Sequence, residues 1–532
     1  MMPATRLLSD CPVECGSDVG RPQPSVGRWP RVWIRALILI SILLAVTCYF
    51  LRSLDRDLIE YGEGPILAMV ARMQREPIAP EWRAHLPLTL SCYGPAYYRT
   101  VALVDRFDPL GPSVVVGRFI NLLAALGTAA LIYLMTLRLT AIRVQAAAGA
   151  LLFLVSPVVC YWLPAYRVDM LAVLCSCGAF MAVAGGLSLR RLVLCGLLVA
   201  LGSLFKQVAA LSALPIWLWL LANRQWRKAA VFAGLVSAFG LAFWGLADLA
   251  TDGSALGPAV KSNLNRMRLE NGLGLFFDFV RYPSSLLSLA AAGWLLRPRT
   301  RNWQQPASLF ALALLTSVGV NVLLSCKEGA ALNYFLEASM LGSIVLTLAV
   351  VPASEDLSQP RVRRAWLAIG LVLVAPALAL LAFDHGGFGI RNANSSVVQA
   401  SLIAGEHTTV LADSEWIDAV LRQGAMPAVN DSFLLSMADR QGSPAVQQLI
   451  DEMHRGQIEF VLLANPTEYY RQRETTRWPS SVVEAMQRDY EPVSSDQHAY
   501  LYRHRSAVAN RARGDGSASA ARGSGGHGTT IR

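Results

Sequence analysis

Long apolar segments recur along most of the chain. The segment VWIRALILISILLAVTCYFL, residues 32–51, has the roughly 20 apolar residues that a helix needs to cross a bilayer. Further apolar segments follow at about 113–137, 144–164, 169–189, 191–205, 208–222, 229–249, 280–296, 306–326, 331–351 and 366–383. The pattern therefore predicts an α-helical polytopic membrane protein with about eleven transmembrane helices. The short segments 191–205 and 208–222 form the weakest part of this prediction.

Basic residues between the apolar segments predict the orientation, because Lys and Arg gather in cytoplasmic loops. Arg28, Arg31 and Arg35 flank the start of the first segment, and no small-residue cleavage site follows it. We interpret this segment as an uncleaved signal anchor with a cytoplasmic N-terminus. The loops that then face the cytoplasm are all basic: RLTAIR, RR, NRQWRK, RPRTR and RVRR. We expect a multi-pass protein of the cell inner (plasma) membrane.

Two parts on the predicted outer side have patterns of their own. In the first outer loop, residues 52–112, EGPILAMVARMQRE places apolar residues on one helix face, which is typical of a helix in the membrane interface. In the tail, TTVLAD and IEFVLLAN favour strands, whereas SEWIDAVLRQG and SPAVQQLIDEMHRGQ favour helices. We predict a transmembrane domain over 32–383, a small extracytoplasmic α/β domain over 384–505, and disordered tails at 1–31 and 506–532.

The composition agrees with a membrane protein. Hydrophobic residues make up 54% of the chain and charged residues 16%, and the mean hydropathy is +0.40. Soluble proteins carry about 25% charged residues. The net charge of +10 is explained by the basic loops, and no nucleic-acid-binding motif is present, so we expect no nucleic acid partner. The nine cysteines have the spacing of neither a disulfide framework nor a zinc site.

Ionisable residues avoid the middles of the apolar segments and gather at their outer ends. They are Asp55, Asp57, Glu60, Glu63, Arg167, Asp169, Lys206, Lys327, Glu328 and Glu337. If the helices pack together, these groups line one cavity at the outer leaflet. Cations there can bind a lipid phosphate, and a carboxylate can accept a proton from an attacking hydroxyl or amine. The combination indicates transfer of a group from a lipid-phosphate carrier to an acceptor.

Sequence motifs for other chemistries are missing. The chain has no Walker A motif, no Rossmann fingerprint and no His-rich metal motif. The predicted cytoplasmic loops are too short to hold a domain for a nucleotide-bound donor. The carboxylates could bind a divalent cation, but no ligand spacing requires one, so we assign no metal ligands.

Four stretches carry a resemblance to a known family. They are DRDLIEYGEGPILA with YGPAYY (55–98), YRVDMLAVLCSCGAF (166–180), LGSLFKQVAALSALP (201–215) and GAALNYFLEASML (329–341). In their order, spacing and common side they resemble the GT-C membrane glycosyltransferases, in particular the bacterial branch akin to the protein mannosyltransferases and the lipid A aminoarabinose transferases. The resemblance covers roughly residues 33–380 and implies a GT-C-like transmembrane domain.

The resemblance implies an enzyme that takes a sugar from a polyprenyl-phosphate carrier on the outer, periplasmic face. The sugar would pass to a glycan, lipid or protein acceptor in one inverting displacement. An acidic residue of the first outer loop would be the base, and Glu63, Glu60 and Asp57 are the candidates. Glu63 aligns best with the family. Where the family has an Asp–Glu pair this chain has Gly62–Glu63, which leaves the identity of the base open.

The resemblance also implies residues that hold the substrates. Arg167, Lys206 and Lys327 would bind the lipid phosphate. Asp169 would be a second acid or the ion-pair partner of Arg167. The candidate substrate contacts are Tyr93, Tyr98, Asn333, Tyr334 and Glu337. Anchoring at the interface, helix capping or packing would explain the same residues equally well.

Three other functions stay open from the sequence. A glycan ligase or polymerase of similar build would pass on a whole glycan. A glycolipid transporter or flippase would leave the donor intact, but bare segment interiors, a long first outer loop and the lack of an inverted repeat argue against it. A scaffold without catalytic activity would use the outer domain to bind a partner.

Overall fold

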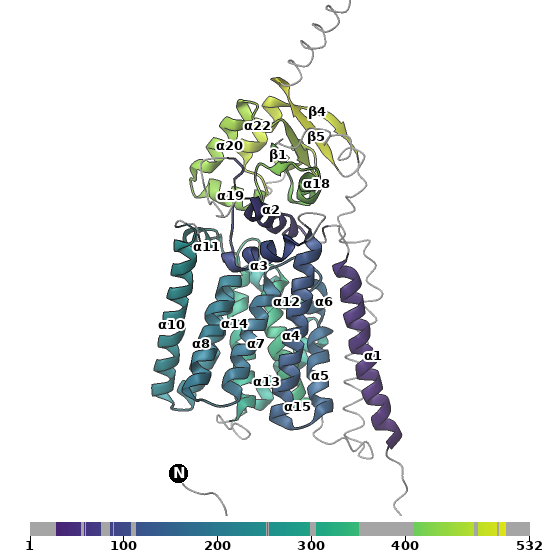
Figure 1. Ribbon diagram of the computed structural model, residues 1–532, viewed down its shortest axis with the longest axis vertical. Helices are drawn as coiled ribbons and strands as arrows, with labels where there is room; N and C mark the ends of the chain where they lie inside the picture. Colours follow the sequence, from purple (N-terminus) through teal and green to yellow (C-terminus); the bar gives the residue numbers. More distant parts are fainter. Residues whose placement is uncertain are drawn as a thin grey trace, which may run out of the picture.

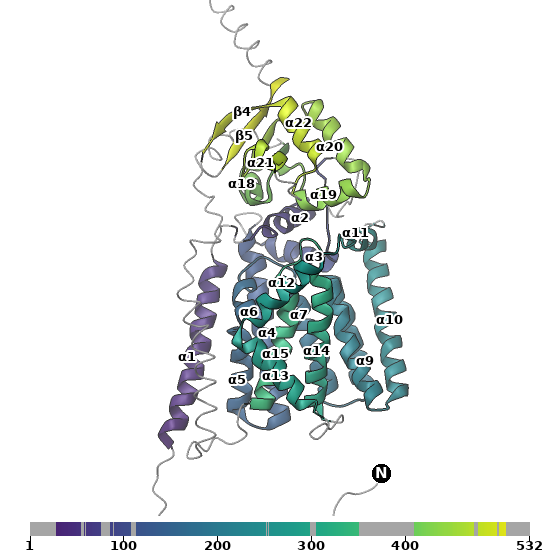
Figure 2. The same cartoon turned by 180° about the vertical axis from the view of Figure 1, so that it is seen from behind.

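The computed structural model describes residues 28–54, 58, 60–75, 86–88, 90–107, 113–251, 253, 255–297, 305–350, 409–472, 477–496 and 499–506. Within these residues, a bundle of helices runs along the long axis of the molecule, and a small unit of strands and helices lies at one end (Figure 1). We call this end of the bundle the capped end. Helices α1 (Arg28–Ser53) and α10 (Trp226–Leu249) lie at opposite edges of the bundle (Figure 2).

The bundle is built mainly of apolar helices. The others are α4 (Val114–Thr140), α5 (Arg143–Leu154), α6 (Pro157–Trp162), α7 (Asp169–Ala184), α8 (Leu189–Phe205), η1 (Gln207–Ser212), α9 (Ala213–Ala222), α12 (Leu269–Val280), α13 (Pro283–Leu295), α14 (Pro306–Ser325), η2 (Leu332–Phe335) and α15 (Leu336–Val350). Helices α2 (Glu63–Arg75), α3 (Pro95–Asp105) and α11 (Leu256–Lys261) lie at the capped end (Figure 1).

Several of these helices can cross a membrane. Among the described residues, four helical segments are long and apolar enough to do so: Val114–Thr140, Trp226–Leu249, Pro306–Ser325 and Leu332–Ala349. The predicted fold class, a helical membrane protein with a small α/β unit near its C-terminus, is confirmed. The predicted segment 366–383 lies outside the described residues, so the count of eleven stays a prediction.

One predicted helix is divided into two, and one predicted loop contains a helix. The segment 144–164 forms α5 and α6, whereas the helix predicted at 280–296 is found as the single helix α13. A proline begins both α6 and α13, Pro157 and Pro283, because proline has no N–H with which to continue a preceding helix. Helix α12 also corrects the prediction of an outer loop over 250–279, where acidic residues concealed the helical pattern.

The bundle core brings distant helices together below the capped end. It is a continuous apolar cluster that includes the buried Phe153, Phe180, Phe310 and Phe335. The rings of Phe180 in α7 and Phe310 in α14 have centroids 6.3 Å apart. Phe279 of α12 stacks on Phe335 of η2 at 4.6 Å. The first contact packs the second half of α7 against α14, and the second holds the end of η2, which carries the predicted site residues Asn333 and Tyr334.

The unit at the capped end contains a five-stranded mixed sheet. Its strands are β1 (Thr409–Ala412), β2 (Met426–Pro427), β3 (Phe460–Leu463), β4 (Tyr490–Ser495) and β5 (Tyr500–His504), in the order β2-β1-β3-β5-β4. Strand β1 is parallel to β2 and β3, and β5 is antiparallel to β3 and β4. The helices are η4 (Ser414–Trp416), α18 (Ile417–Arg422), α19 (Ser432–Arg440), α20 (Pro444–His454), α21 (Thr467–Gln472) and α22 (Ser480–Asp489). Strands β1 and β3 and helices α18 and α20 correspond to the four predicted elements.

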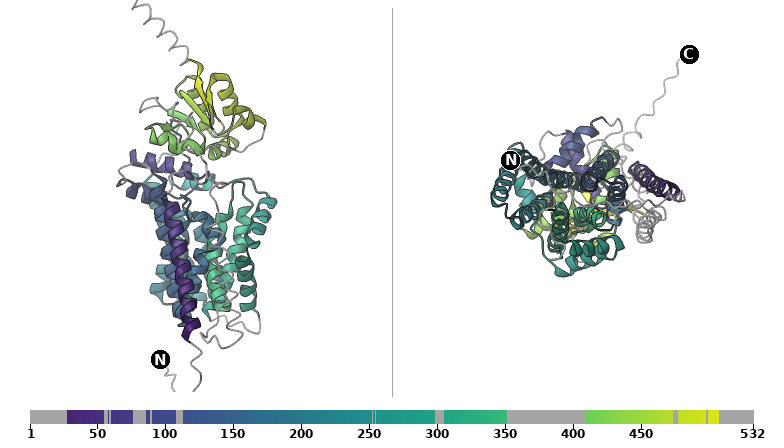
Figure 3. Two further views of the ribbon diagram at one scale, coloured as in Figure 1. Left: turned by 90° about the vertical axis from the view of Figure 1, so that its right-hand side faces the viewer. Right: turned by 90° about the horizontal axis from the view of Figure 1, so that it is seen from below.

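The segment between α1 and α4 ties this unit to the bundle. Helix α2 lies between the two (Figure 3), and its residues 66–73 are buried, so it is not the interface helix that the sequence predicts. A Cβ atom on Gly64 would lie 2.0 Å from the carbonyl oxygen of Ser414, so glycine permits this close approach. The side chain of Asn430 bonds both the backbone N–H and the carbonyl of Leu90, at 2.7 and 2.8 Å.

Candidate active site

A buried ion pair holds the first turn of α2. Both carboxylate oxygens of Glu63 accept hydrogen bonds from Arg118 of α4, from Nε at 3.0 Å and from Nη2 at 2.8 Å. The Tyr166 amide also donates to Glu63, at 2.5 Å. Both side chains of the ion pair have 0% exposure. Glu63 is buried away from solvent, and both of its carboxylate oxygens accept hydrogen bonds. This position does not support the sequence-based prediction that Glu63 is the base.

Glu60 is the more accessible carboxylate of the same loop. Its Oε2 accepts a hydrogen bond from Nη1 of Arg167 at 3.0 Å and from the Gly62 amide at 2.8 Å. Nη2 of Arg167 donates to the hydroxyl of Tyr93 at 2.9 Å. The Glu60 side chain is 21% exposed, and its Oε1 makes no hydrogen bond with a described residue. This oxygen is therefore available to a substrate.

Gly62 explains how the Glu60–Arg167 pair fits into the loop. A Cβ atom on Gly62 would lie 1.5 Å from Nη1 of Arg167 and 2.9 Å from Oε2 of Glu60. The guanidinium and the carboxylate therefore occupy the space that a side chain at position 62 would take. The carboxylate of Glu60 thus lies close to the place where the side chain of an aspartate at position 62 would start.

Tyr61 joins this loop to the α/β unit. Its hydroxyl donates to Oδ1 of Asp431 at 3.1 Å and accepts from the Phe433 amide at 3.2 Å. The guanidinium of Arg477 lies 5.0 Å from the centroid of the Tyr61 ring. Burial raises the pKa of Asp431 to about 6, so this carboxyl is mainly ionised at neutral pH. Burial also raises the pKa of Tyr61, with a further increase from Asp431, which keeps the phenol neutral.

A second polar cluster lies at the start of α7. Asp169 forms an ion pair with Lys206 and accepts hydrogen bonds from Nδ2 of Asn333 at 3.1 and 3.3 Å. Nε of Arg167 lies 3.8 Å from the same carboxylate. Nζ of Lys206 is 4.6 Å from the centroid of the Tyr334 ring. Five residues predicted from three separate stretches of the sequence thus meet, but Asp169 and Lys206 are buried and engaged with each other.

A cavity of about 910 Å³, part of it open to solvent, lies between these residues and the α/β unit. Seven predicted site residues line it: Glu60, Tyr93, Tyr98, Arg167, Lys327, Asn333 and Tyr334. Lys327 forms no ion pair with a described residue. Burial and the positive charge of Lys206 lower the pKa of Lys327. An anion bound in the cavity would balance the positive charge of Lys327.

The remaining predicted site residues do not line the cavity. Glu63, Asp169, Lys206 and Glu337 are absent from its described wall, and Asp57 lies outside the described residues. Among the described residues, no group of three or more His, Cys, Asp or Glu side chains is placed to hold a metal ion.

Three residues of this region were not predicted from the sequence: Arg118, Tyr61 and Asp431. Arg118 stands inside an apolar segment, and a charge at such a place is a recognisable signal of function or pairing. Tyr61 and Asp431 are 370 positions apart, and nothing in either segment indicates their contact.

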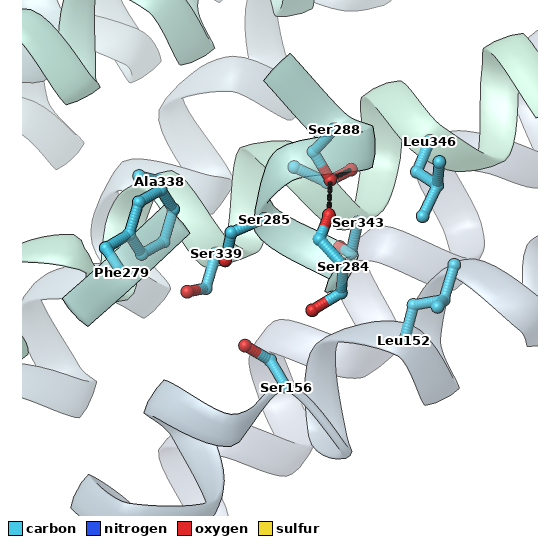
Figure 4. A pocket seen from close by; sticks show the side chains of 11 residues that line it. Leu152, Ser156, Phe279, Ser284, Ser285, Ser288, Ala338, Ser339, Ser343 and Leu346 are labelled. Carbon is cyan, nitrogen blue, oxygen red and sulfur yellow. Dashed lines mark hydrogen bonds between the residues drawn. The ribbon is translucent and has the colours of Figure 1, made fainter. Parts of the chain in front are cut away.

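A second cavity lies within the bundle, where α5 meets α6 and α12 meets α13. It encloses about 310 Å³, and six serines contribute to its wall together with apolar residues. Figure 4 shows the hydroxyls of Ser156, Ser284 and Ser339 facing a common space. None of the described residues that line it is acidic or basic, so these residues offer no group for acid–base chemistry. The cavity at the capped end is therefore the candidate active site.

Comparison with known proteins identifies a similar family and two similar structures. Residues 109–244 match the family described as dolichyl-phosphate-mannose-protein mannosyltransferase. No curated protein matches the chain. ArnT from Cupriavidus metallidurans bound to undecaprenyl phosphate is similar with a TM-score of 0.59 and 13% identity, over 87% of this chain and 97% of that chain. Its apo structure gives 0.60 and 12%, over 89% and 98%. At 13% and 12% identity, the similarity to these two structures shows a shared fold and nothing finer.

Proposed function

From the GT-C fold that this chain shares with ArnT, we propose that it is a glycosyltransferase. It moves a sugar from a polyprenyl-phosphate carrier to an acceptor, in the cavity at the capped end and on the outer face of the membrane. The similar ArnT structure was solved with undecaprenyl phosphate, which supports a lipid carrier of this class. The matched mannosyltransferase family supports sugar transfer.

One observation carries the proposal: the cavity combines an accessible carboxylate with cations suited to a phosphate. Glu60 faces it from one wall, Arg167 binds Glu60, and Lys327 has no carboxylate partner in the described part of the chain. Arg can bind phosphate oxygens with two N–H groups, and Lys binds them as a point charge. A lipid phosphate bound by these cations would place its sugar close to Glu60.

The proposed reaction is a single displacement. The acceptor oxygen attacks the anomeric carbon while the bond from that carbon to the phosphate oxygen breaks, which inverts the configuration. Glu60 accepts the acceptor proton. Arg167 and Lys327 stabilise the negative charge on the departing lipid phosphate. Asn333 and Tyr334 are held by the cluster around Asp169 and would contact the sugar.

A release assay tests this function. The full chain in lipid nanodiscs is given a panel of radiolabelled polyprenyl-phosphate sugars together with a membrane lipid extract as acceptor. We expect free lipid phosphate to appear with at least one sugar. A transporter or flippase would leave every donor intact, and a glycan ligase would use only carriers that bear an oligosaccharide. Either of these results would contradict the proposal.

Lys327→Gln should weaken donor binding. Hydrogen bonds to charged groups contribute about 1.5–3 kcal/mol, so the donor KM should rise roughly 10-fold or more. The kcat should change less, because Glu60 is untouched. Lys261→Gln provides a matched control, since Lys261 lies in α11 at the same end of the bundle, is exposed and does not line the cavity. Equal donor KM values for both variants would contradict the assignment of Lys327.

A further inference from the structure

The α/β unit contributes its own wall to the cavity. Four residues of the loop after β2 and of the first turn of α19 line the cavity opposite residues of the bundle: Asn430, Asp431, Phe433 and Leu434. They belong to the α/β unit, which lies beyond the capped end of the helix bundle (Figure 1). A donor anchored in the membrane would use the bundle side, which leaves this wall to the acceptor.

The carboxylates that line the cavity differ in how their charges are balanced. Glu60 forms an ion pair with Arg167, and Glu328 forms one with Arg440 at 2.7 Å. Asp431 has no ion pair with any described residue.

Hydrogen bonds hold the carboxylate of Asp431 at the cavity wall. Its Oδ1 accepts hydrogen bonds from the Tyr61 hydroxyl and from the Leu434 amide, both at 3.1 Å, and the Phe433 backbone also contributes a hydrogen bond to the carboxylate. The residue as a whole is 9% exposed, and it lines the cavity. A carboxylate at such a wall, with no ion pair to a described residue, can accept a further hydrogen bond from the hydroxyl of a ligand.

We infer that Asp431 selects the acceptor: it accepts a hydrogen bond from a neutral, hydroxyl-bearing acceptor and disfavours acceptors that carry a negative charge. The inference rests on the proposed function. A sugar or side-chain hydroxyl can donate a hydrogen bond to the carboxylate. A phosphate or carboxylate on the acceptor would instead face the negative charge of Asp431, which forms no ion pair with a described residue, at short range in a partly desolvated cavity.

The test uses two probe acceptors that differ by one charged group, octyl β-glucoside and octyl β-glucuronide. Each is titrated at pH 7.5 into full-length protein in nanodiscs, and the rate of lipid-phosphate release from the radiolabelled donor is recorded. A reacting probe accelerates release, and a probe that binds without reacting inhibits the slow hydrolysis, so either gives a half-saturating concentration. We expect the glucoside to half-saturate at a concentration at least about 10-fold lower than the glucuronide.

The variant Asp431→Asn should reduce this preference to less than about 3-fold. Asparagine is an equally good helix N-cap, so α19 keeps its start and the unit stays folded. Glu328→Gln is the matched control: it removes another carboxylate from the cavity wall, but one that Arg440 already neutralises, and the preference should persist.

Three results would overturn the inference: an unchanged preference in Asp431→Asn, an equal loss in Glu328→Gln, or no response of the wild type to either probe up to its solubility limit. Failure of the proposed function is recognised separately, because lipid phosphate would then not be released from any donor, with or without a probe.

Discussion

Glu60→Gln should lower sugar transfer by about 10²–10⁴-fold, the range expected when a positioned general base is lost. The amide keeps the shape of the side chain and can accept a hydrogen bond from the Gly62 amide, but it cannot take the acceptor proton. The measurement is kcat/KM for lipid-phosphate release in the presence of an acceptor. The donor KM should change by much less than kcat, since Arg167 and Lys327 are retained.

The folded state should tolerate this change. Glu60 and Arg167 are 21% and 12% exposed, and Arg167 retains its hydrogen bond to Tyr93 and its proximity to Asp169 when Glu60 is neutral. Breaking an exposed ion pair costs roughly 0–1 kcal/mol, and breaking a fully buried one costs about 3–5 kcal/mol. The Glu60–Arg167 pair lies between these cases, so Glu60→Gln should destabilise the protein less than a variant that breaks the fully buried Glu63–Arg118 pair. An active Glu60→Gln variant would exclude Glu60 as the base.

The double variant Glu60→Gly with Gly62→Asp tests why this loop departs from the family pattern. The space beside position 62 is filled by Arg167 and by the carboxylate of Glu60. Removing the Glu60 side chain frees part of that space, and the flexible end of Arg167 can move to pair with the new carboxylate. We expect transfer about 10-fold above that of Glu60→Gly alone. No recovery would show that the carboxylate must come from position 60.

The sequence predicted the general location of the site because local patterns determine it. Charges at the ends of apolar segments identify one end of the bundle, and the glycine-rich EYGEGP segment precedes α2. Residues from this loop, Arg167 just before α7, and Asn333 and Tyr334 of η2 do line one cavity. Predictions of this kind depend on composition and spacing, which can be read from short stretches of the sequence.

The sequence could not show which carboxylate is accessible. Glu60 and Glu63 differ in their distant partners: Arg118 lies 55 positions after Glu63, and Arg167 lies 107 positions after Glu60. A bidentate, fully buried contact removes Glu63 from the surface, and no local pattern reports it. The contribution of the α/β unit was hidden for the same reason, since Asp431 reaches the cavity only through long-range docking on Tyr61.

The division of the predicted helix 144–164 has a related cause. The hydropathy of a segment reports whether it is apolar but not whether it is straight, so α5 and α6 were expected as one helix. The proline that begins α6 was visible in the sequence. Treating a proline inside an apolar segment as a helix start would have predicted this division.

Glu63→Gln should destabilise the protein strongly, which is the opposite of the behaviour expected for Glu60→Gln. The change leaves the guanidinium of Arg118 without its carboxylate in a place where both side chains have 0% exposure. Removing one partner of a buried ion pair costs about 3–5 kcal/mol, because the other charge stays buried and uncompensated. The free energy of unfolding, followed by denaturation of the protein in detergent micelles, should fall by that amount, and the yield of folded protein should drop.

The control for this prediction removes both charges. Replacing an entire buried ion pair with apolar residues of similar volume is often neutral or stabilising, whereas removing one partner is costly. The double variant Glu63→Leu with Arg118→Met should therefore be more stable than Glu63→Gln, and it should keep measurable transfer because Glu60, Arg167 and Lys327 are unchanged. If Glu63→Gln were instead as stable as the wild type and inactive, the buried pair would not be the anchor of α2, and Glu63 would replace Glu60 as the candidate base.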